Sequence, residues 1–184
     1  MKLSQLSILL GCVVATLQVF ALARPKQFGE AVTRFPRHLP TGIVLMLLGT
    51  AWFVWNVYVE PIADFKPIKP YLMIAFAVVG IGSCFVVQDY LAVRGAAVVM
   101  LLVAKLMVDS GRPHLGETPW VLIIQAWGYV LAVAGIWFTM WPWRMRDLLQ
   151  WATATEKRIK IGSAFRLSFA VLVIVLGFTA FKGM

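Results

Sequence analysis

The sequence predicts an all-α protein, a polytopic transmembrane helical bundle of about six spans arranged as three hairpins. Of its 184 residues, 61% are hydrophobic and only 14% are charged, whereas a soluble domain is roughly 45–50% apolar and about 25% charged. The apolar residues form long runs, and the basic residues lie in the loops and at the ends of these runs. We therefore expect the whole chain, 1–184, to form a single transmembrane domain.

Six apolar runs are long enough to cross a bilayer. A helix of roughly 17–25 apolar residues spans the hydrocarbon layer of about 30 Å and satisfies its own backbone hydrogen bonds. The predicted spans are, in chain order, 6–23, 41–59, 71–87, 91–108, 120–141 and 165–181. Successive spans pair into three hairpins, whose inner connections are 24–40, 88–90 and 142–164.

The first span has an alternative interpretation as a secretory signal peptide. Lys2 precedes the run, which ends in Ala21-Leu22-Ala23, a pattern similar to a cleavage site. Cleavage would leave Arg24 outside and would also place the basic loop 142–164 outside, against the tendency of Lys and Arg to stay in cytoplasmic loops. We expect the first span to be retained.

The basic residues predict an orientation. With the N-terminus outside, eleven of the 17 basic residues lie on the inner side. The outer side then holds Lys2, Lys66, Lys69, Lys105, Arg112 and Lys182. Because cytoplasmic loops carry an excess of Lys and Arg, this distribution predicts a multi-pass protein with both termini outside.

The third inner connection contains a candidate interfacial helix at about 144–160. Apolar residues recur there at helical spacing, and basic residues lie toward both ends. Such a helix lies in the headgroup layer and attracts anionic lipid. Its candidate docking residues for lipid or a partner are Arg144, Arg146, Lys157, Arg158 and Lys160. The alternative is a loop that only sets topology.

A second candidate site is a small polar cluster at the outer mouth, formed by Lys105, Asp109, Arg112 and His114. Asp109 follows Lys105 at i+4, so the two can pair on one helix face. The cluster could bind an anion or line a vestibule together with Gln125 and Asn56. The alternative is a loop stabilised by local pairs.

Small residues flank the tight turn 88–90. Gly80, Gly82 and Ser83 precede it, and 95–97 follow it as Gly-Ala-Ala. Because small residues let transmembrane helices approach closely, we expect the third and fourth spans to pack together.

The sequence lacks the residue combinations that haem ligation, metal binding, catalysis or nucleic-acid recognition would require. The two histidines, His38 and His114, fall on opposite sides of the membrane in the predicted topology, which excludes bis-histidine ligation within the chain. We find no catalytic set and expect no cofactor and no metal site. The net charge of +9 could indicate nucleic-acid binding, but no recognition module accompanies it, so we expect no nucleic-acid partner.

The last hairpin, 128–177, contains Trp141-Pro142-Trp143-Arg144-Met145-Arg146 and later Lys160-Ile161-Gly162 before its final span. This pattern resembles small two-helix bacterial inner-membrane proteins of unknown function, and the whole chain is similar to uncharacterised polytopic bacterial inner-membrane proteins. The resemblance implies a location in a bacterial inner (cytoplasmic) membrane, and it implies no activity. The sequence thus favours a non-enzymatic structural or accessory subunit that packs against other membrane proteins or itself, with a small transporter or channel as the alternative.

Overall fold

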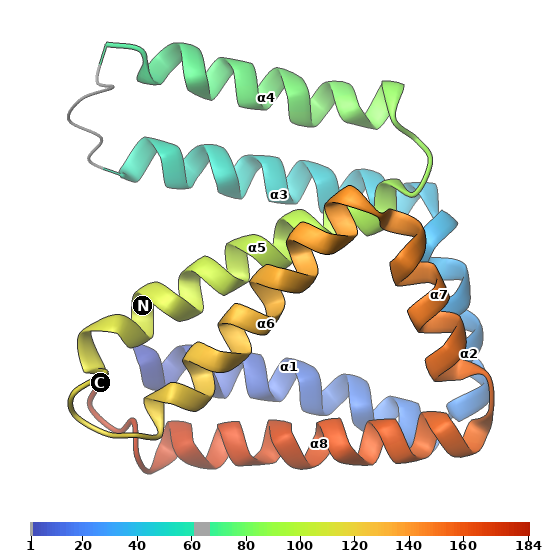
Figure 1. Ribbon diagram of the computed structural model, residues 1–184, viewed down its shortest axis with the longest axis vertical. Helices are drawn as coiled ribbons and strands as arrows, with labels where there is room; N and C mark the ends of the chain where they lie inside the picture. The colour runs from blue at the N-terminus through green and yellow to red at the C-terminus, as the bar shows by residue number, and fades with distance from the viewer. Residues whose placement is uncertain (1, 61–66) are drawn as a thin grey trace. The chain divides into compact units, whose positions relative to one another are not determined.

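The computed structural model describes residues 2–60 and 67–184, and these residues form eight α-helices. In chain order the helices are α1 Leu3–Ala23, α2 Pro25–Arg34, α3 Leu39–Val59, α4 Lys69–Val86, α5 Leu91–Gly111, α6 Val121–Met140, α7 Pro142–Thr153 and α8 Glu156–Phe178 (Figure 1). Short 3-10 helices cover Phe35–Arg37 and Arg112–His114. Lys66, which the orientation argument assigns to the outer side, lies outside the described residues.

Six of these helices are long and apolar enough to cross a membrane: α1, α3, α4, α5, α6 and α8. Each overlaps one of the six predicted runs, so the predicted all-α fold with six spans is confirmed. The chain is a multi-pass membrane protein with six candidate spans. Helix α8 begins at Glu156, well before the predicted start at 165, because charged residues such as Lys157 and Arg158 are also good helix formers.

The connections 24–40 and 142–164, which the sequence predicts to lie on the inner side, contain helices that differ from those expected. The connection 24–40 holds α2, which begins with Pro25, at the first helical position that proline favours. The predicted interfacial helix 144–160 is divided, since α7 ends at Thr153 and α8 begins at Glu156. The hydroxyl of Thr155 accepts a hydrogen bond from the backbone N–H of Arg158 at 3.3 Å, an N-cap that starts a new helix.

The chain divides into two compact units. Unit 1 comprises 1–33, 103–132 and 146–184, and unit 2 comprises 34–102 and 133–145. Helices α5 and α6 each contribute one part to unit 1 and the other part to unit 2. The units are therefore not separate stretches of sequence, and the single transmembrane domain expected from the sequence stays a prediction.

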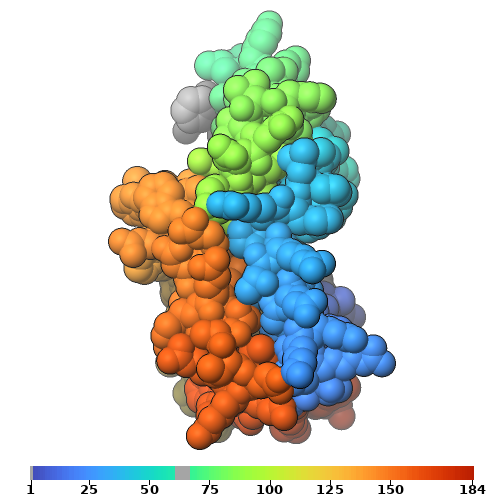
Figure 2. Space-filling model, turned by 90° about the vertical axis from the view of Figure 1, so that its right-hand side faces the viewer, coloured from blue at the N-terminus to red at the C-terminus, as the bar shows by residue number. Residues whose placement is uncertain are grey.

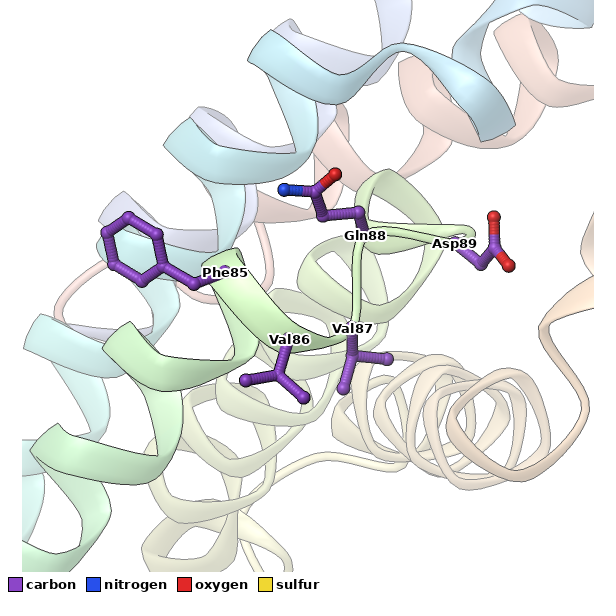
Figure 3. Close-up of a pocket in the computed structure, with 5 residues that line it drawn as sticks. All are labelled: Phe85, Val86, Val87, Gln88 and Asp89. Carbon is purple, nitrogen blue, oxygen red and sulfur yellow. The ribbon is translucent and has the colours of Figure 1, made fainter.

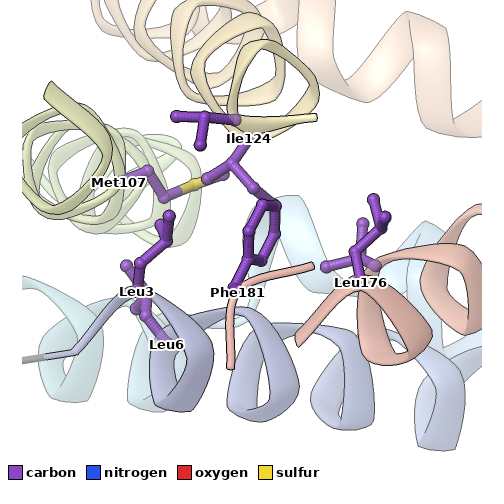
Figure 4. Close-up of a cluster of buried hydrophobic side chains, with 8 residues drawn as sticks. Leu3, Leu6, Met107, Ile124, Leu176 and Phe181 are labelled. Atoms are coloured by element: carbon purple, nitrogen blue, oxygen red, sulfur yellow. The ribbon is translucent and has the colours of Figure 1, made fainter. Parts of the chain in front are cut away.

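Unit 1 is built around α1 and α8, which run antiparallel. A Cβ added to Gly11 would lie 3.1 Å from the carbonyl oxygen of Ala170, and one added to Gly177 would lie 3.2 Å from that of Ser4. The two glycines let the helix backbones approach closely. A buried cluster lies where α1 begins and α8 ends, with Phe181 among Leu3, Ile124 and Leu176 (Figure 4).

Unit 2 is built around α3, which packs against both α4 and the first part of α5. The side chain of Thr50 fills the space beside Gly80 of α4. A Cβ on Gly95 of α5 would lie 2.8 Å from the backbone nitrogen of Met46. Two of the three glycines expected to join the third and fourth spans, Gly80 and Gly95, thus face α3 instead. Sequence order alone could not predict that choice of partner.

Candidate functional site

At one end of unit 1, α2 packs on the junction between α7 and α8. We call α2 and the residues of this junction the basic layer. A Cβ on Gly29 would lie 3.2 Å from Cδ1 of Ile159 and 3.9 Å from Cβ of Thr153. The small residue therefore lets α2 approach this junction. Figure 2 shows the blue surface of α2 beside the orange surface of residues around 146–160.

An ion pair, a cation–π contact and a hydrogen bond join residues of this layer. Nζ of Lys26 lies 3.7 Å from Oε1 of Glu156, which links α2 to α8. The Arg158 guanidinium lies 5.3 Å from the centroid of the Trp151 ring, and it also donates to the Trp151 carbonyl oxygen at 3.3 Å. Both Arg158 and Trp151 are exposed. An exposed tryptophan whose ring makes a cation–π contact is typical of a membrane interface.

The five predicted docking residues have different surroundings. Arg146 pairs with Asp147 at 2.7 Å, and Arg158 stacks on Trp151. Lys157 and Lys160 are exposed in unit 1. Arg144 is exposed and belongs to unit 2. Their role in docking lipid or a partner stays a prediction.

The residues of the predicted outer cluster form local pairs. Nζ of Lys105 lies 2.6 Å from Oδ2 of Asp109, and Nδ1 of His114 lies 3.0 Å from Oε1 of Glu117. Arg112 is exposed on the short 3-10 helix between α5 and α6. These are the contacts that the local-pair interpretation expects.

Gln125, which the transporter hypothesis assigns to the same vestibule, serves a contact between helices instead. It is 5% exposed, and its amide nitrogen donates to the carbonyl oxygen of Val108 at 3.0 Å. Gly111 leaves room for this amide on α5. The bond joins α6 to α5 within unit 1, so the amide nitrogen of Gln125 already has a hydrogen-bond partner inside the protein.

Sequence reasoning missed a polar contact between α1 and α8. Nε of Arg166 donates to Oε1 of Gln18 at 3.1 Å. Gln18 is 7% exposed and Ser163, one turn before Arg166, is fully buried. In the described part of the chain the Ser163 hydroxyl has no hydrogen-bond partner. Both Gln18 and Arg166 are recognisable as polar residues near the ends of apolar runs, but their pairing depends on α1 and α8 being neighbours.

Two shallow hollows lie on unit 2. One, of about 350 Å³, is lined at the end of α4 by Phe85, Val86, Val87, Gln88 and Asp89. Its side chains diverge, with Gln88 and Asp89 pointing to different sides (Figure 3). The other, of about 450 Å³, is lined by Tyr58, Lys69, Pro70, Met73 and Ile74.

Lys69, the one charged residue in the second hollow's lining, has partners of its own. It donates to the carbonyl oxygens of Tyr58 at 2.6 Å and Glu60 at 2.9 Å. The cation therefore caps the end of α3. Neither hollow presents converging groups of the kind that ligand sites use.

Within the described residues, no three His, Cys, Asp or Glu side chains gather as metal ligands would. The expectation of no metal and no cofactor stays a prediction. Cys12 of unit 1 and Cys84 of unit 2 are free thiols. Neither a known protein family, nor a curated protein, nor a solved structure matches this chain. The comparisons therefore add no relative, and the resemblance of the last hairpin also stays a prediction.

Proposed function

We propose that this protein is a non-enzymatic structural or accessory subunit of a membrane protein complex, and that a transmembrane helix of a partner polypeptide packs on α4. In this proposal the complex lies in a bacterial inner membrane, with the basic helix ends in the cytoplasm and both termini outside. The observation that carries the proposal is the position of Gly82. Among the described residues, a Cβ added to Gly82 would meet no atom within 4 Å.

The other glycines of the candidate spans support this argument. Apart from Gly162, each lies close enough to another helix that an added Cβ would come within 4 Å of it: Gly11, Gly42, Gly49, Gly80, Gly95, Gly111, Gly128, Gly135 and Gly177. Glycine inside a helix is less stable than alanine by about 1 kcal/mol. In this protein that loss is offset by close helix packing. At Gly82, no helix in the described part of the chain lies close enough to offset it.

The surface around Gly82 fits a helix. Tyr71, Ala75, Val78, Gly82 and Phe85 follow one another at intervals of three and four residues on the side of α4 opposite Gly80. Tyr71 is 72% exposed and Phe85 75% exposed. Exposed apolar side chains alone indicate only lipid contact. A glycine and an alanine between large side chains form the hollow into which a second membrane helix packs.

Photo-cross-linking in native membranes tests the proposal. In a Cys12→Ser, Cys84→Ala background, Gly82→Cys is labelled with a short photoreactive group. Leu48→Cys on α3 is the matched control, because it lies at a similar level of the α3–α4 pair and is 51% exposed. We expect a covalent adduct with a second polypeptide from position 82 and none from position 48. Equal yields from both positions, or a bond within the same chain, would contradict the proposal.

The size of the complex provides a second test. Gly82→Leu fills the hollow with a side chain that the isolated protein has room for. Ala51→Leu adds similar bulk at an exposed position of α3. In mild detergent, Gly82→Leu should release a single chain of 20.5 kDa from a larger assembly, while Ala51→Leu should leave the assembly intact. A parent protein that purifies only as a lone chain would refute the idea. A species of twice the chain mass would identify the partner as a second copy.

A further inference from the structure

Arg166 lies where α8 changes from a charged to an apolar helix. The helix begins at Glu156, and its early turns carry Lys157, Arg158 and Lys160. Arg166 follows ten residues after that start, which corresponds to about 15 Å along the axis. The next charged residue along the chain is Lys182, beyond the end of the helix. A guanidinium at this level is near the boundary between headgroups and hydrocarbon.

The side chain of Arg166 folds back toward the charged start of α8. Its Nη2 lies 3.4 Å from the position that a Cβ on Gly162 would occupy. Long basic side chains at helix ends extend in this way toward the interface. The three side-chain atoms nearest to such a Cβ on Gly162 all belong to the Arg166 guanidinium. The missing side chain of Gly162 therefore leaves open space beside the guanidinium.

Gln18 fixes the orientation of the guanidinium. Its Oε1 accepts the Nε–H of Arg166 at 3.1 Å, and α1 holds the amide almost fully buried, at 7% exposure. With Nε occupied, the two Nη groups remain to donate elsewhere. A guanidinium is a planar fork that binds a carboxylate or a phosphate through two parallel hydrogen bonds.

Arg166 has no acidic partner in the described part of the chain. Ion pairs there join other cations to carboxylates, among them Lys26, Lys105 and Arg146. An ionised side chain at membrane depth is costly and is normally paired. One turn earlier, the buried Ser163 hydroxyl also lacks a partner among the described residues. The seam between α1 and α8 thus holds one oriented cation whose counter-charge comes from outside these residues.

We propose that Arg166 binds the phosphate of an anionic phospholipid at the seam between α1 and α8, with Gln18 as a positioning residue. The headgroup phosphate lies against the guanidinium in the space beside Gly162. The acyl chains lie along the apolar surface of α8, where Phe165 is 77% exposed. The site is independent of the partner surface on α4, because Gly82 belongs to unit 2 and these residues belong to unit 1.

Native mass spectrometry of the detergent-solubilised full-length protein tests the site. Phosphatidylglycerol is titrated, with phosphatidylcholine and inorganic phosphate in separate arms. We expect one phosphatidylglycerol to bind first, and more tightly than phosphatidylcholine. Arg166→Gln should weaken that first binding event at least tenfold. Lys160→Gln, which removes an exposed cation from the same helix, should change it less than twofold. Equal losses in the two variants would show a diffuse surface attraction and overturn the proposal.

Three further variants keep the positive charge and separate the positioning of the guanidinium from electrostatics. Gln18→Leu leaves Arg166 in place but frees its Nε, so we expect affinity to fall severalfold. Gly162→Leu fills the space beside the guanidinium and should weaken binding as strongly as Arg166→Gln. Arg166→Lys should recover only part of the affinity, because an ammonium cannot form the paired bonds. Circular dichroism and thermal unfolding check that each variant is folded. Full affinity in the folded Gly162→Leu protein, or displacement of lipid by inorganic phosphate, would refute a lipid site.

Discussion

The pairs α1–α8 and α3–α4 are both antiparallel and both pack through glycines, but they use these glycines differently. In α1–α8 each helix offers a glycine to the other, since Gly11 faces Ile174 and Gly177 faces Ile8. In α3–α4, Gly80 faces Thr50, whereas an added Cβ at Gly82 would meet no atom of residues 2–60 or 67–184 within 4 Å. Hydrophobicity therefore accounts for the position of all four helices in lipid, and the placement of small residues accounts for where another helix can approach.

The largest expected effect is at the shared seam of α1 and α8. A Cβ at position 177 would lie 2.7 Å from Cγ1 of Ile8 and 3.2 Å from the backbone oxygen of Ser4. Gly177→Leu should lower the free energy of unfolding by about 3 kcal/mol, because overpacking forces the two backbones apart. Unfolding by sodium dodecyl sulfate in mixed micelles measures the change. In a Gly177→Ala protein, Ile8→Ala should recover part of the stability; no loss in the leucine variant would refute this contact.

The next effect compares two glycines of the same helix. Gly80→Ala places its Cβ against Thr50, whose own Cβ would be 2.8 Å away, so we expect a loss of about 1–3 kcal/mol. Gly82→Ala meets open space and should raise stability by about 0.5–1 kcal/mol through helix propensity. The same unfolding titration applies, and Thr50→Ala should rescue Gly80→Ala. If the two alanine variants behaved alike, the contrast between the two sides of α4 would fail.

A smaller effect tests whether hydrogen bonds between helices contribute to stability in addition to the close packing at glycines. Gln125→Leu removes the bond to the Val108 carbonyl oxygen, and such bonds between membrane helices average about 0.6 kcal/mol with a maximum near 1.7. We expect a loss of about 1 kcal/mol. Asn56→Leu is the control, since the Asn56 side chain makes no hydrogen bond within the described residues. If the Gln125→Leu protein were as stable as the parent, packing alone would account for the stability of unit 1.

The smallest effect is expected for the exposed pair Lys105–Asp109, whose side chains are 43% and 48% exposed. Lys105→Ala should change stability by only about 0.3–0.5 kcal/mol. The difference should diminish at 1 M salt, where screening acts over about 3 Å. Unfolding curves at low and high salt provide the measurement. A loss above 1 kcal/mol that persists in salt would assign this residue a larger role.

The six spans could be predicted because hydrophobicity is a local property of the sequence. Helix α2 was missed because its polar residues, Gly29 and neighbouring prolines resemble those of a loop. The break before α8 had a signal that was overlooked, since Thr155 followed by Glu156 is a typical helix start. The partners of Gly80, Gly95 and Arg166 could not be predicted. Gln18 and Arg166 are separated by 148 positions in the sequence, and only the packed fold brings them together.

The pairing of α1 with α8 also has a consequence for the order in which the protein assembles during synthesis. The hydroxyl of Ser4 donates to the carbonyl oxygen of Met184 at 3.3 Å, across 180 positions of sequence. Ribosomes add roughly 5–20 residues per second, so α1 enters the membrane on the order of ten seconds before its partner helix exists. Unit 2 is complete in sequence at Met145. During that interval Gly11 and Gln18 of α1 have no α8 to pack against, so they face lipid or the insertion machinery until α8 emerges.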